Sequence, residues 1–597
     1  MLENKFKVGL MALLVTAALS GCSLDGDDGE QGPQGAQGEA GADGADGSVG
    51  ADGADASLGV SLAVIGRSVV GGEGAAEIVQ YHKATQTIYA TNGESDTVSV
   101  IAIADLTGEA VDSPVSADTL SSTSVTLPTE VNGVALDGLT SIAVKDDLLA
   151  VAIPADEKSE NGYVLFYTGL NDSTPAFLKA VEVGNLPDNV AFTPDGTKVL
   201  TANEGEPSDD YTVDPEGSVS VITINDGVPA DSATTLTFEG FNTQQSQLEA
   251  MGMQFPNPSG RTINGVTINT TVAMDLEPEY ITATNDTAYV TLQENNGLAV
   301  VDLTTMTISL IGLGVKDWSG YQIDAQEDGE VSFGQYDGLY GVYMPDTITH
   351  TTWKDATFLL TANEGDAREY IFDADDEAAC LAAGGEDFDD GDCLAYTDEV
   401  KVKDLNAESN SPLAMLQANG EIDDLRVTLG MGDADGDGEY DGAYTYGARS
   451  FTIWDQNGQV VFDSGDDFER ITASVHGAAF NNGDDENEGD SRSENKGPEP
   501  EAITTGKVGD RNYAFIGTER MGGIFVYDIT NPYNVTFSEY VINRDLTEGL
   551  DVDDGIGDLA PESLVFVPAD ASPTGEALLV VGNEISGSVT LWQVTAN

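Results

Sequence analysis

Residues 187–222 read PDNVAFTPDGTKVLTANEGEPSDDYTVDPEGSVSVI and hold one full copy of a unit that recurs along the chain. Asp188 follows a proline and opens a short apolar run, and the β-rich run after it ends in an Asn followed by Glu204. Another apolar run begins at Gly217. Proline suits the first residue of a strand because it cannot donate to a ladder. The stretch therefore predicts three β-strands, with one acid opening the first and another ending the second.

The same elements return in further units of the chain. A proline and an acid precede an apolar run again at Glu279, Asp346, Glu501 and Glu562. A polar-acidic pair ends the following run at Glu294, Glu364, Glu519 and Glu584. Two degenerate copies come first, one containing Glu77 and one at 141–152. Seven units of this kind predict an all-β, seven-bladed propeller. A β-sandwich is the alternative, but it would not repeat one acidic pair at matching places.

The domain boundaries follow from the repeats. The propeller is expected to span 60–597, and the strand at 60–65 should complete the last blade by pairing with the C-terminal strands. Such closure protects sheet edges in an exported protein. Two long segments without the repeat, about 238–274 and 366–447, are expected to be loop insertions that decorate the propeller.

The repeated acids predict a common site. If the inner strand runs away from one face, the next strand returns to it, so both acids lie on one rim near the central channel. Eleven carboxylates would meet there: Glu77, Asp188, Glu204, Glu279, Glu294, Asp346, Glu364, Glu501, Glu519, Glu562 and Glu584. Like charges at close range need cations or basic partners, and hard divalent cations prefer oxygen ligands. A rim metal is one interpretation; the other is a structural belt whose acids accept backbone hydrogen bonds between blades.

A sharper metal motif lies at 433–441, where DADGDGEYD follows the pattern D-x-D-x-D-G-x-x-D. Alternate carboxylates can converge on one cation, and Gly438 permits the sharp turn. Position twelve is Tyr444 rather than Glu, so the motif is not an EF-hand. The expected ligands of a Ca²⁺ ion are Asp433, Asp435, Asp437, Asp441 and, through its backbone carbonyl, Glu439. The alternative is an acidic solvated turn.

The composition excludes several partners. Among 597 residues, 104 are Asp or Glu and 23 are Lys or Arg, which gives a net charge of -81. Such a chain repels nucleic-acid phosphates, and it avoids anionic membranes unless it is tethered. With 40% hydrophobic residues, it can nevertheless build a core.

The N-terminal sequence predicts export and a lipid anchor. Two lysines precede an apolar run at 8–19, which is too short to span a bilayer and is typical of a signal peptide, here 1–21. Leu19-Ser20-Gly21-Cys22 resembles the bacterial lipobox, which implies that Cys22 is lipidated. Ser23 in place of Asp implies an outer-membrane or cell-surface lipoprotein, attached to the membrane by its anchor alone. An ordinary cleavage site with an incidental Cys is the alternative.

The segment 22–59 is expected to be a spacer. Glycine recurs at every third position from Gly26 to Gly53, as a collagen triple helix requires, but Pro33 is the only proline. A flexible spacer and a stalk that trimerises the protein both remain open. In the body, Cys380 and Cys393 are expected to form a disulfide, because export leads to an oxidising compartment.

Several motifs together resemble the choice-of-anchor I family. They include TPDG at 193–196, DLEPEY at 275–280, RSFTIW at 449–454 and KGPEPE at 496–501, within a match over roughly 60–597. The resemblance implies an exported, variously anchored, calcium-associated propeller at the cell surface. Some bacterial members are labelled alkaline phosphatases. The first unit departs from the pattern, because Glu77 has no proline before it.

Two functions remain open from the sequence. One is a calcium-binding propeller that binds an extracellular ligand or surface. The other is a calcium-dependent phosphomonoesterase whose candidate residues are Glu364, Arg368, Arg492, Glu519 and Arg520. Arginines beside rim acids suit a phosphoester, although each arginine would equally form an ion pair with a neighbouring Glu. The three histidines are scattered, and no nucleophile elbow or phosphate loop is present.

Overall fold

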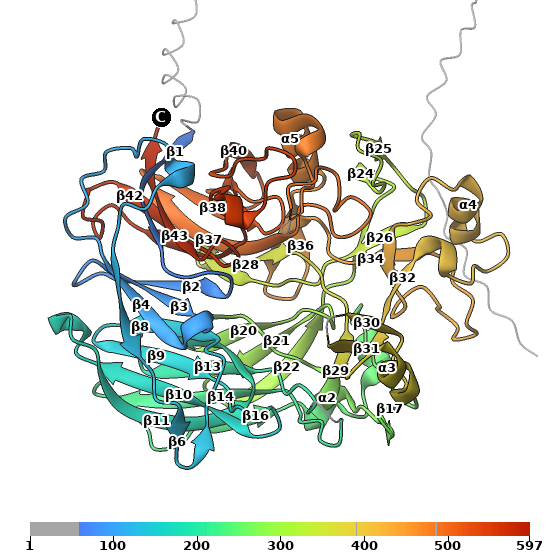
Figure 1. Cartoon of the computed structure of the whole chain (residues 1–597), viewed down its shortest axis with the longest axis horizontal. Coiled ribbons are helices and arrows are strands. Elements are labelled where there is room, and N and C mark those ends of the chain that lie inside the picture. The colour runs from blue at the N-terminus through green and yellow to red at the C-terminus, as the bar shows by residue number, and fades with distance from the viewer. Residues whose placement is uncertain (1–58, 209–210, 390, 484–485) are drawn as a thin grey trace, which may run out of the picture. The chain divides into compact units, whose positions relative to one another are not determined.

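The computed structural model describes residues 59–597, apart from 209–210, 390 and 484–485. The predicted signal peptide, the lipidated Cys22 and the Gly-X-Y triplets lie outside the described residues. The described body is all-β and propeller-like (Figure 1). None of its helices is long and apolar enough to cross a membrane.

The first sheets follow one another along the chain. The first contains β2 (Ala75–His82), β3 (Thr87–Asn92), β4 (Thr97–Ala102) and β5 (Ser122–Thr126). The second contains β8 (Ser141–Lys145), β9 (Leu148–Ile153), β10 (Asn161–Thr168) and β11 (Ala176–Asn185). The third contains β12 (Pro187–Phe192), β13 (Lys198–Asn203), β14 (Ser218–Asn225), β15 (Val228–Pro229) and β16 (Thr234–Thr237). The fourth contains β19 (Ile281–Ala283), β20 (Thr287–Leu292), β21 (Gly297–Asp302) and β22 (Thr307–Gly312).

Three further sheets lie in the second half of the chain. The fifth contains β27 (Ile348–Trp353), β28 (Ala356–Asn363), β35 (Ser450–Asp455) and β36 (Val460–Asp463). The sixth contains β37 (Pro500–Val508), β38 (Arg511–Thr518), β39 (Ile524–Asp528) and β40 (Thr536–Val541). The last contains β41 (Pro561–Val567), β42 (Ala577–Asn583), β43 (Ser588–Ala596) and β1 (Val60–Val69).

The sheets follow one another around a centre, from blue on the left of Figure 1 through green to red at the top. In each sheet the innermost strand lies beside the innermost strand of the next sheet, and β41 lies beside β2. The N-terminal strand β1 pairs antiparallel with β43, from Val60 opposite Ala596 to Val69 opposite Ser588. The two ends of the described body therefore share one sheet.

The strand sequences are apolar on both faces because both faces are covered. In β13, Val199 packs toward the second sheet, whereas its neighbour Leu200 packs toward the fourth. Successive side chains of a strand point to opposite faces, so an inner strand between two sheets needs apolar residues at both. Each pair of neighbouring sheets encloses a hydrophobic cluster of this kind, including one between the last sheet and the first.

The connections carry the helices and several short strands. The α-helices are α1 (Gln245–Glu249), α2 (Val272–Asp275), α3 (Glu377–Ala383), α4 (Pro412–Asn419) and α5 (Asp467–His476). The short strands are β6 (Glu130–Val131), β7 (Val134–Ala135), β17 (Thr262–Ile263), β18 (Val266–Thr267), β23 (Val315–Asp317), β24 (Ile323–Asp324), β25 (Phe333–Gly334), β26 (Leu339–Val342), β29 (Glu369–Asp373), β30 (Asp387–Asp389), β31 (Asp392–Thr397), β32 (Glu399–Lys401), β33 (Arg426–Thr428) and β34 (Ala443–Thr445). Most lie in the segments between β16 and β19 and between β28 and β35, where Cys380 and Cys393 form a disulfide.

Candidate functional site

Strand pairing brings the two acids of a unit together. In the third sheet Pro187 pairs with Asn203, which places the following acids, Asp188 and Glu204, at the same end of the hairpin. The backbone N–H of Glu204 donates to the carbonyl of Leu186 at 3.0 Å. The sixth and last sheets repeat this pairing at their own Pro and polar residues. The proline and the acidic pair therefore mark one structural position in the third, sixth and last sheets.

A β-bulge follows the proline in these hairpins, between Pro187 and Asn189 and again in the sixth and last sheets. The residue before the proline has positive φ, 42° at Leu186, 42° at Met344 and 57° at Ala560. A left-handed residue other than Gly costs about 1 kcal/mol or more. Bulges and such residues redirect a side chain at the end of a strand. A strained left-handed residue before the proline therefore accompanies the acid after the proline in several units.

The structure brings the rim acids within electrostatic reach of one another. Burial and the charges of Glu562 and Asp188 raise the pKa of Glu77 well above its ordinary value. Burial and Glu562 raise the pKa of Asp188 to about 7. The same two causes raise the pKa of Glu584 to about 7. Without a cation or a basic partner, part of this ring must hold protons at neutral pH.

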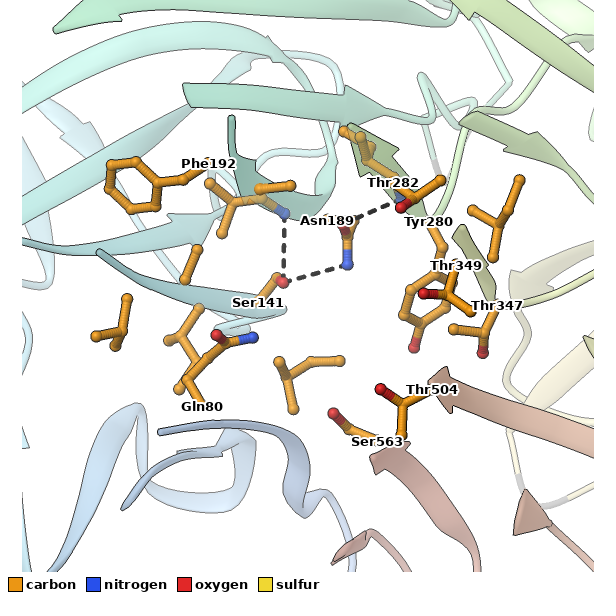
Figure 2. A pocket seen from close by; sticks show the side chains of 18 of the residues that line it. Gln80, Ser141, Asn189, Phe192, Tyr280, Thr282, Thr347, Thr349, Thr504 and Ser563 are labelled. Carbon is orange, nitrogen blue, oxygen red and sulfur yellow. Dashed lines mark hydrogen bonds between the residues drawn. The ribbon is translucent and has the colours of Figure 1, made fainter. Parts of the chain in front are cut away.

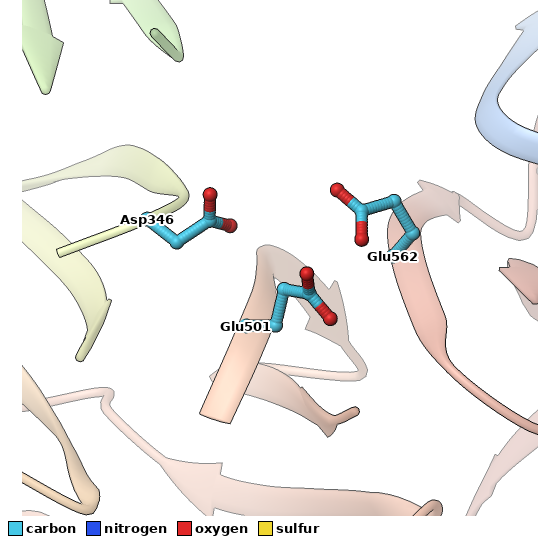
Figure 3. A group of neighbouring side chains, drawn as sticks. All are labelled: Asp346, Glu501 and Glu562. Atoms are coloured by element: carbon cyan, nitrogen blue, oxygen red, sulfur yellow. The ribbon is translucent and has the colours of Figure 1, made fainter. Parts of the chain in front are cut away.

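Three of these acids form a compact group that we call the channel-mouth cluster: Asp346, Glu501 and Glu562. Their carboxyl groups face one another in Figure 3, and one oxygen from each lies within 4.8 Å of the others. Glu501 and Glu562 lie at the start of β37 and β41, and Asp346 lies just before β27, so each acid belongs to a different sheet. No Lys, Arg or His of the described residues forms an ion pair with any of the three.

Hydrogen bonding at this cluster is incomplete. Tyr280 donates its hydroxyl hydrogen to Glu562, and Thr347 Oγ1 donates to Asp346 Oδ2 at 2.7 Å. Glu501 is 8% exposed, and its Oε2 has no hydrogen-bond partner in the described chain. Glu279, also 8% exposed, carries another such buried oxygen, with no partner among the described residues. A buried carboxylate oxygen without a partner is costly, so these oxygens indicate a missing ligand.

The cluster borders a central channel of about 400 Å³. Its lining comes from the innermost strands of all seven sheets, including β2, β8 and β12. Figure 2 shows hydroxyl and amide side chains around it, among them Ser141, whose Oγ accepts from Asn189 Nδ2 at 3.4 Å. The channel therefore combines an acidic end with a lining of neutral polar groups.

A second group of acids, which we call the lysine-bound cluster, contains Glu364, Glu499 and Glu519. Lys496 Nζ lies 2.7 Å from Glu364 Oε1 and 3.5 Å from Glu499 Oε2. Burial alone would lower the pKa of Lys496, but the surrounding carboxylates raise it well above its ordinary value. Arg492 Nε lies 2.7 Å from Glu499 Oε1. The chain itself supplies the cations that this cluster needs.

The three candidate arginines are all ion-paired. Arg368 pairs with Glu277, and its Nη2 lies 3.6 Å from Glu294 Oε2. Arg520 Nε lies 3.3 Å from a carboxylate oxygen of each of Glu499 and Glu519. With Arg492 on Glu499, the geometry favours the ion-pair interpretation over a phosphate site.

The structural-belt interpretation gains no backbone hydrogen bond to a carboxylate of the channel-mouth cluster among the described residues. The residue that fastens the hairpin is the Asn before the acid: Asn203 Nδ2 donates to the Ser218 carbonyl at 3.1 Å, and Asn583 Nδ2 does the same to Ser588. Among the described residues, no backbone N–H donates to the side chain of Glu501 or Glu562. The side chains of Glu501 and Glu562 therefore do not fasten neighbouring sheets through backbone hydrogen bonds.

The 433–441 loop lies on the exposed insertion between β28 and β35. One oxygen each of Asp433, Asp435 and Asp437 lies within 4.8 Å of the others. Asp433 accepts from the backbone N–H groups of Gly436 and Gly438 at 2.8 and 2.9 Å, which fixes its carboxylate. The Asp441 carboxyl is not in this group of three. Instead it hydrogen-bonds Glu408, whose pKa is raised by that bond and by the charges of Asp441, Asp435 and Asp437.

Sequence reasoning missed several residues of these sites. Lys496 and Glu499 stand in a motif that was noted, but their charges were not assigned to the rim. A signal for Glu499 was present, because it is the first acid of the repeated Pro-Glu at 498–501. Tyr280 and Glu408 gave no signal, because their roles depend on contacts with distant segments.

Comparison with known proteins gives a family and a few relatives. The model of the choice-of-anchor I domain matches residues 77–532. Gigasin-3a of Magallana gigas is 31% identical over 169 residues, which are 26% of this chain and 60% of that protein. The mesenchyme-specific cell surface glycoprotein of Strongylocentrotus purpuratus is 32% identical over 253 residues, 38% of this chain and 31% of that protein. The chain thus spans less than two thirds of either relative.

Among solved structures, the β-propeller domain of Cps50 (Swd1) from Myceliophteria thermophila is similar with a TM-score of 0.37 and 9% identity. The match covers 90% of this chain and 100% of the Cps50 chain.

Proposed function

The chain belongs to the choice-of-anchor I family, and on this premise we propose that it is an exported, surface-tethered propeller that binds Ca²⁺ through the 433–441 loop. In this function the propeller presents a face to an extracellular ligand or surface. The convergence of the Asp433, Asp435 and Asp437 carboxylates in an exposed loop is the observation that carries the calcium proposal.

We propose that the body is a seven-bladed propeller closed by the pairing of β1 with β43. Support comes from seven sheets whose innermost strands all line one channel. Further support comes from the hydrophobic cluster between the last sheet and the first, which includes Val79 and Val580. A ring closed in this way leaves no inner sheet edge available to other chains.

The loop has the properties of a calcium site rather than of a rigid cage for a smaller ion. Ca²⁺ accepts six to eight oxygens in flexible geometry, at about 2.3–2.6 Å. Three aspartates, a backbone carbonyl at Glu439 and water would meet this need. Glu408 and Asp441 add a further carboxyl pair beside the loop.

Tethering is proposed from the N-terminal sequence and the family. The lipobox-like 19–22 motif supports a lipid anchor on Cys22, and the Gly-X-Y spacer would lift the body from the outer membrane. One relative is named a cell surface glycoprotein, which agrees with a surface location. Replacing Cys22 by Ala should move the protein from the membrane fraction to the soluble fraction. Retention in the membrane fraction would contradict the anchor.

The phosphomonoesterase predicted as an alternative gains no support from the geometry. Its three arginines are held by carboxylates, and an arginine in an ion pair is not available to a phosphoryl group without losing that pair. The geometry therefore favours the binding function over this activity. Calcium-dependent hydrolysis of para-nitrophenyl phosphate by the purified chain would contradict this conclusion.

The calcium proposal is tested by silencing the loop. The full chain and a variant with Asp433, Asp435 and Asp437 all replaced by Ala are stripped with chelator and titrated with Ca²⁺ by calorimetry. The variant should bind one Ca²⁺ fewer per chain, and its Tm should fall in Ca²⁺ but not in chelator. Asp375→Ala removes an exposed acid of the same insertion and should change neither result. Equal stoichiometry in the variant would contradict the proposal.

A further inference from the structure

We propose that Asp346, Glu501 and Glu562 bind one hard divalent cation, Ca²⁺ by preference, at the mouth of the central channel. This site is separate from the 433–441 loop, and neither depends on the other. Its ligands come from three sheets that are distant in the sequence, so the bound ion would tie those sheets together at the centre of the ring.

The number and grouping of the carboxylate oxygens suit calcium. Ca²⁺ takes six to eight oxygens at about 2.3–2.6 Å in flexible geometry, whereas Mg²⁺ demands a nearly ideal octahedron at about 2.0–2.1 Å. The three carboxylates already bring one oxygen each within 4.8 Å of the others. Three carboxylates supply up to six oxygens, and water from the channel can complete the shell.

An unpartnered buried oxygen distinguishes this cluster from an ordinary acidic patch. Glu501 Oε2 is buried and has no hydrogen-bond donor in the described chain. Glu279 Oε2, beside the neighbouring sheet, is also buried and has no hydrogen-bond donor among the described residues. Among the described residues, Tyr280 donates a hydroxyl hydrogen to Glu562 and Thr347 donates one to Asp346, and Glu501 and Glu562 are within hydrogen-bonding distance of each other. The remaining oxygens face one another, and a cation is the partner that satisfies them together.

The lysine-bound cluster provides the internal comparison. It has the same number of carboxylates on the same rim, but Lys496, Arg492 and Arg520 already occupy its oxygens. A cation there would have to displace a buried lysine. The chain thus neutralises one cluster with its own side chains and leaves the other to be neutralised from solution.

The test uses the full chain with the loop silenced by the triple Asp433, Asp435 and Asp437 replacement. At about pH 8, this background should still bind one Ca²⁺. Adding Glu501→Gln should weaken that binding at least roughly tenfold, because a direct ligand is lost. In chelator, the Tm of Glu501→Gln should stay at or above that of its parent, since glutamine keeps the shape of the side chain and adds no charge; this result shows that the variant folds. Glu364→Gln, in the lysine-bound cluster, should leave the Ca²⁺ affinity unchanged.

Terbium locates the ion independently. Tb³⁺ is a hard cation whose emission is excited through a nearby tyrosine ring, and Tyr280 touches Glu562. On the loop-silenced background, Tyr280→Phe should remove most of the tyrosine-excited emission while the Ca²⁺ stoichiometry stays at one. The proposal is overturned if the loop-silenced chain binds no Ca²⁺, if Glu501→Gln binds as tightly as its parent, or if Glu364→Gln weakens binding as much as Glu501→Gln.

Discussion

The channel-mouth cluster and the lysine-bound cluster are two solutions to one electrostatic problem. Both gather three carboxylates whose oxygens lie within 4.8 Å. At the lysine-bound cluster the connection before β37 inserts Lys496, and Arg492 and Arg520 lie beside it. At the channel mouth the chain offers a tyrosine and a threonine hydroxyl instead. Hydroxyl donors support a carboxylate, but they do not cancel its charge.

The difference separates structural acids from candidate binding acids within one repeat. An acid with a built-in cation is fixed by it, and removing either partner leaves a buried charge. An acid without one must be neutralised by protons or by an ion from solution. The repeated motif alone does not reveal which of these applies to a given copy.

The largest loss of stability is expected when Lys496 is removed from the lysine-bound cluster. Lys496→Met keeps most of the side-chain volume but leaves Glu364 and Glu499 without their cation. We expect a loss of about 3–5 kcal/mol in the free energy of unfolding in chelator, the usual effect of breaking a buried pair. Denaturant unfolding measures it. Lys403→Ala, which removes an exposed pair with Asp424, is the control and should cost less than about 1 kcal/mol. Similar losses in both variants would contradict the comparison.

The pH dependence of stability provides a second test of the acids near the channel mouth. Asp188 and Glu584 have pKa values raised to about 7 by burial and by Glu562. The folded state therefore binds more protons than the unfolded chain between the ordinary carboxyl range and about pH 7, and stability falls as the pH rises through that window. In chelator the slope is at most about 1.4 kcal/mol per pH unit for each group. Thermal unfolding at several pH values checks this.

Calcium supplies the control for the pH prediction. A bound cation favours the ionised carboxylates, so saturating Ca²⁺ should flatten the fall in stability. Stability that rises with pH in chelator over the same window would contradict the raised pKa values.

The exposed loop offers a third kind of carboxyl group for comparison. Glu408 hydrogen-bonds Asp441 beside the three loop aspartates, so it supports the proposed ion without being one of the three. We expect Glu408→Gln to weaken Ca²⁺ binding at the loop about tenfold, the usual effect of losing a supporting residue. The affinity of the loop is measured by calorimetric titration of a chain that also carries Glu501→Gln, because this change weakens binding at the channel mouth. Unchanged affinity would show that the Glu408–Asp441 pair does not contribute to Ca²⁺ binding at the loop.

The smallest effect is expected at Tyr280. Tyr280→Phe removes the hydroxyl that donates to Glu562 and should cost about 1 kcal/mol in chelator. Its packing between sheets is kept, so no cavity term is added. Denaturant unfolding in chelator and in Ca²⁺ measures the change. A loss of the size expected for Lys496→Met would mean that one hydroxyl matters as much as a charge, and would remove the distinction between the clusters.

The repeat made much of this molecule predictable. The β-structure, the inner strands beginning at Pro187, Pro500 and Pro561, and the position of the acids at one end of each hairpin follow from local patterns. Family membership followed from motifs of the same kind. A proline that cannot donate, an alternating apolar run and an acid after a strand are properties of neighbouring residues, so the sequence displays them.

The partners of the acids were not predictable in this way. Lys496 and Glu364 are 132 positions apart, and Tyr280 and Glu562 are 282 apart. The sequence by itself determined that the acids recur at one structural position. Only the tertiary structure decided which acids meet a lysine and which meet only one another, because neutralising a buried charge depends on distances between segments that no local pattern records.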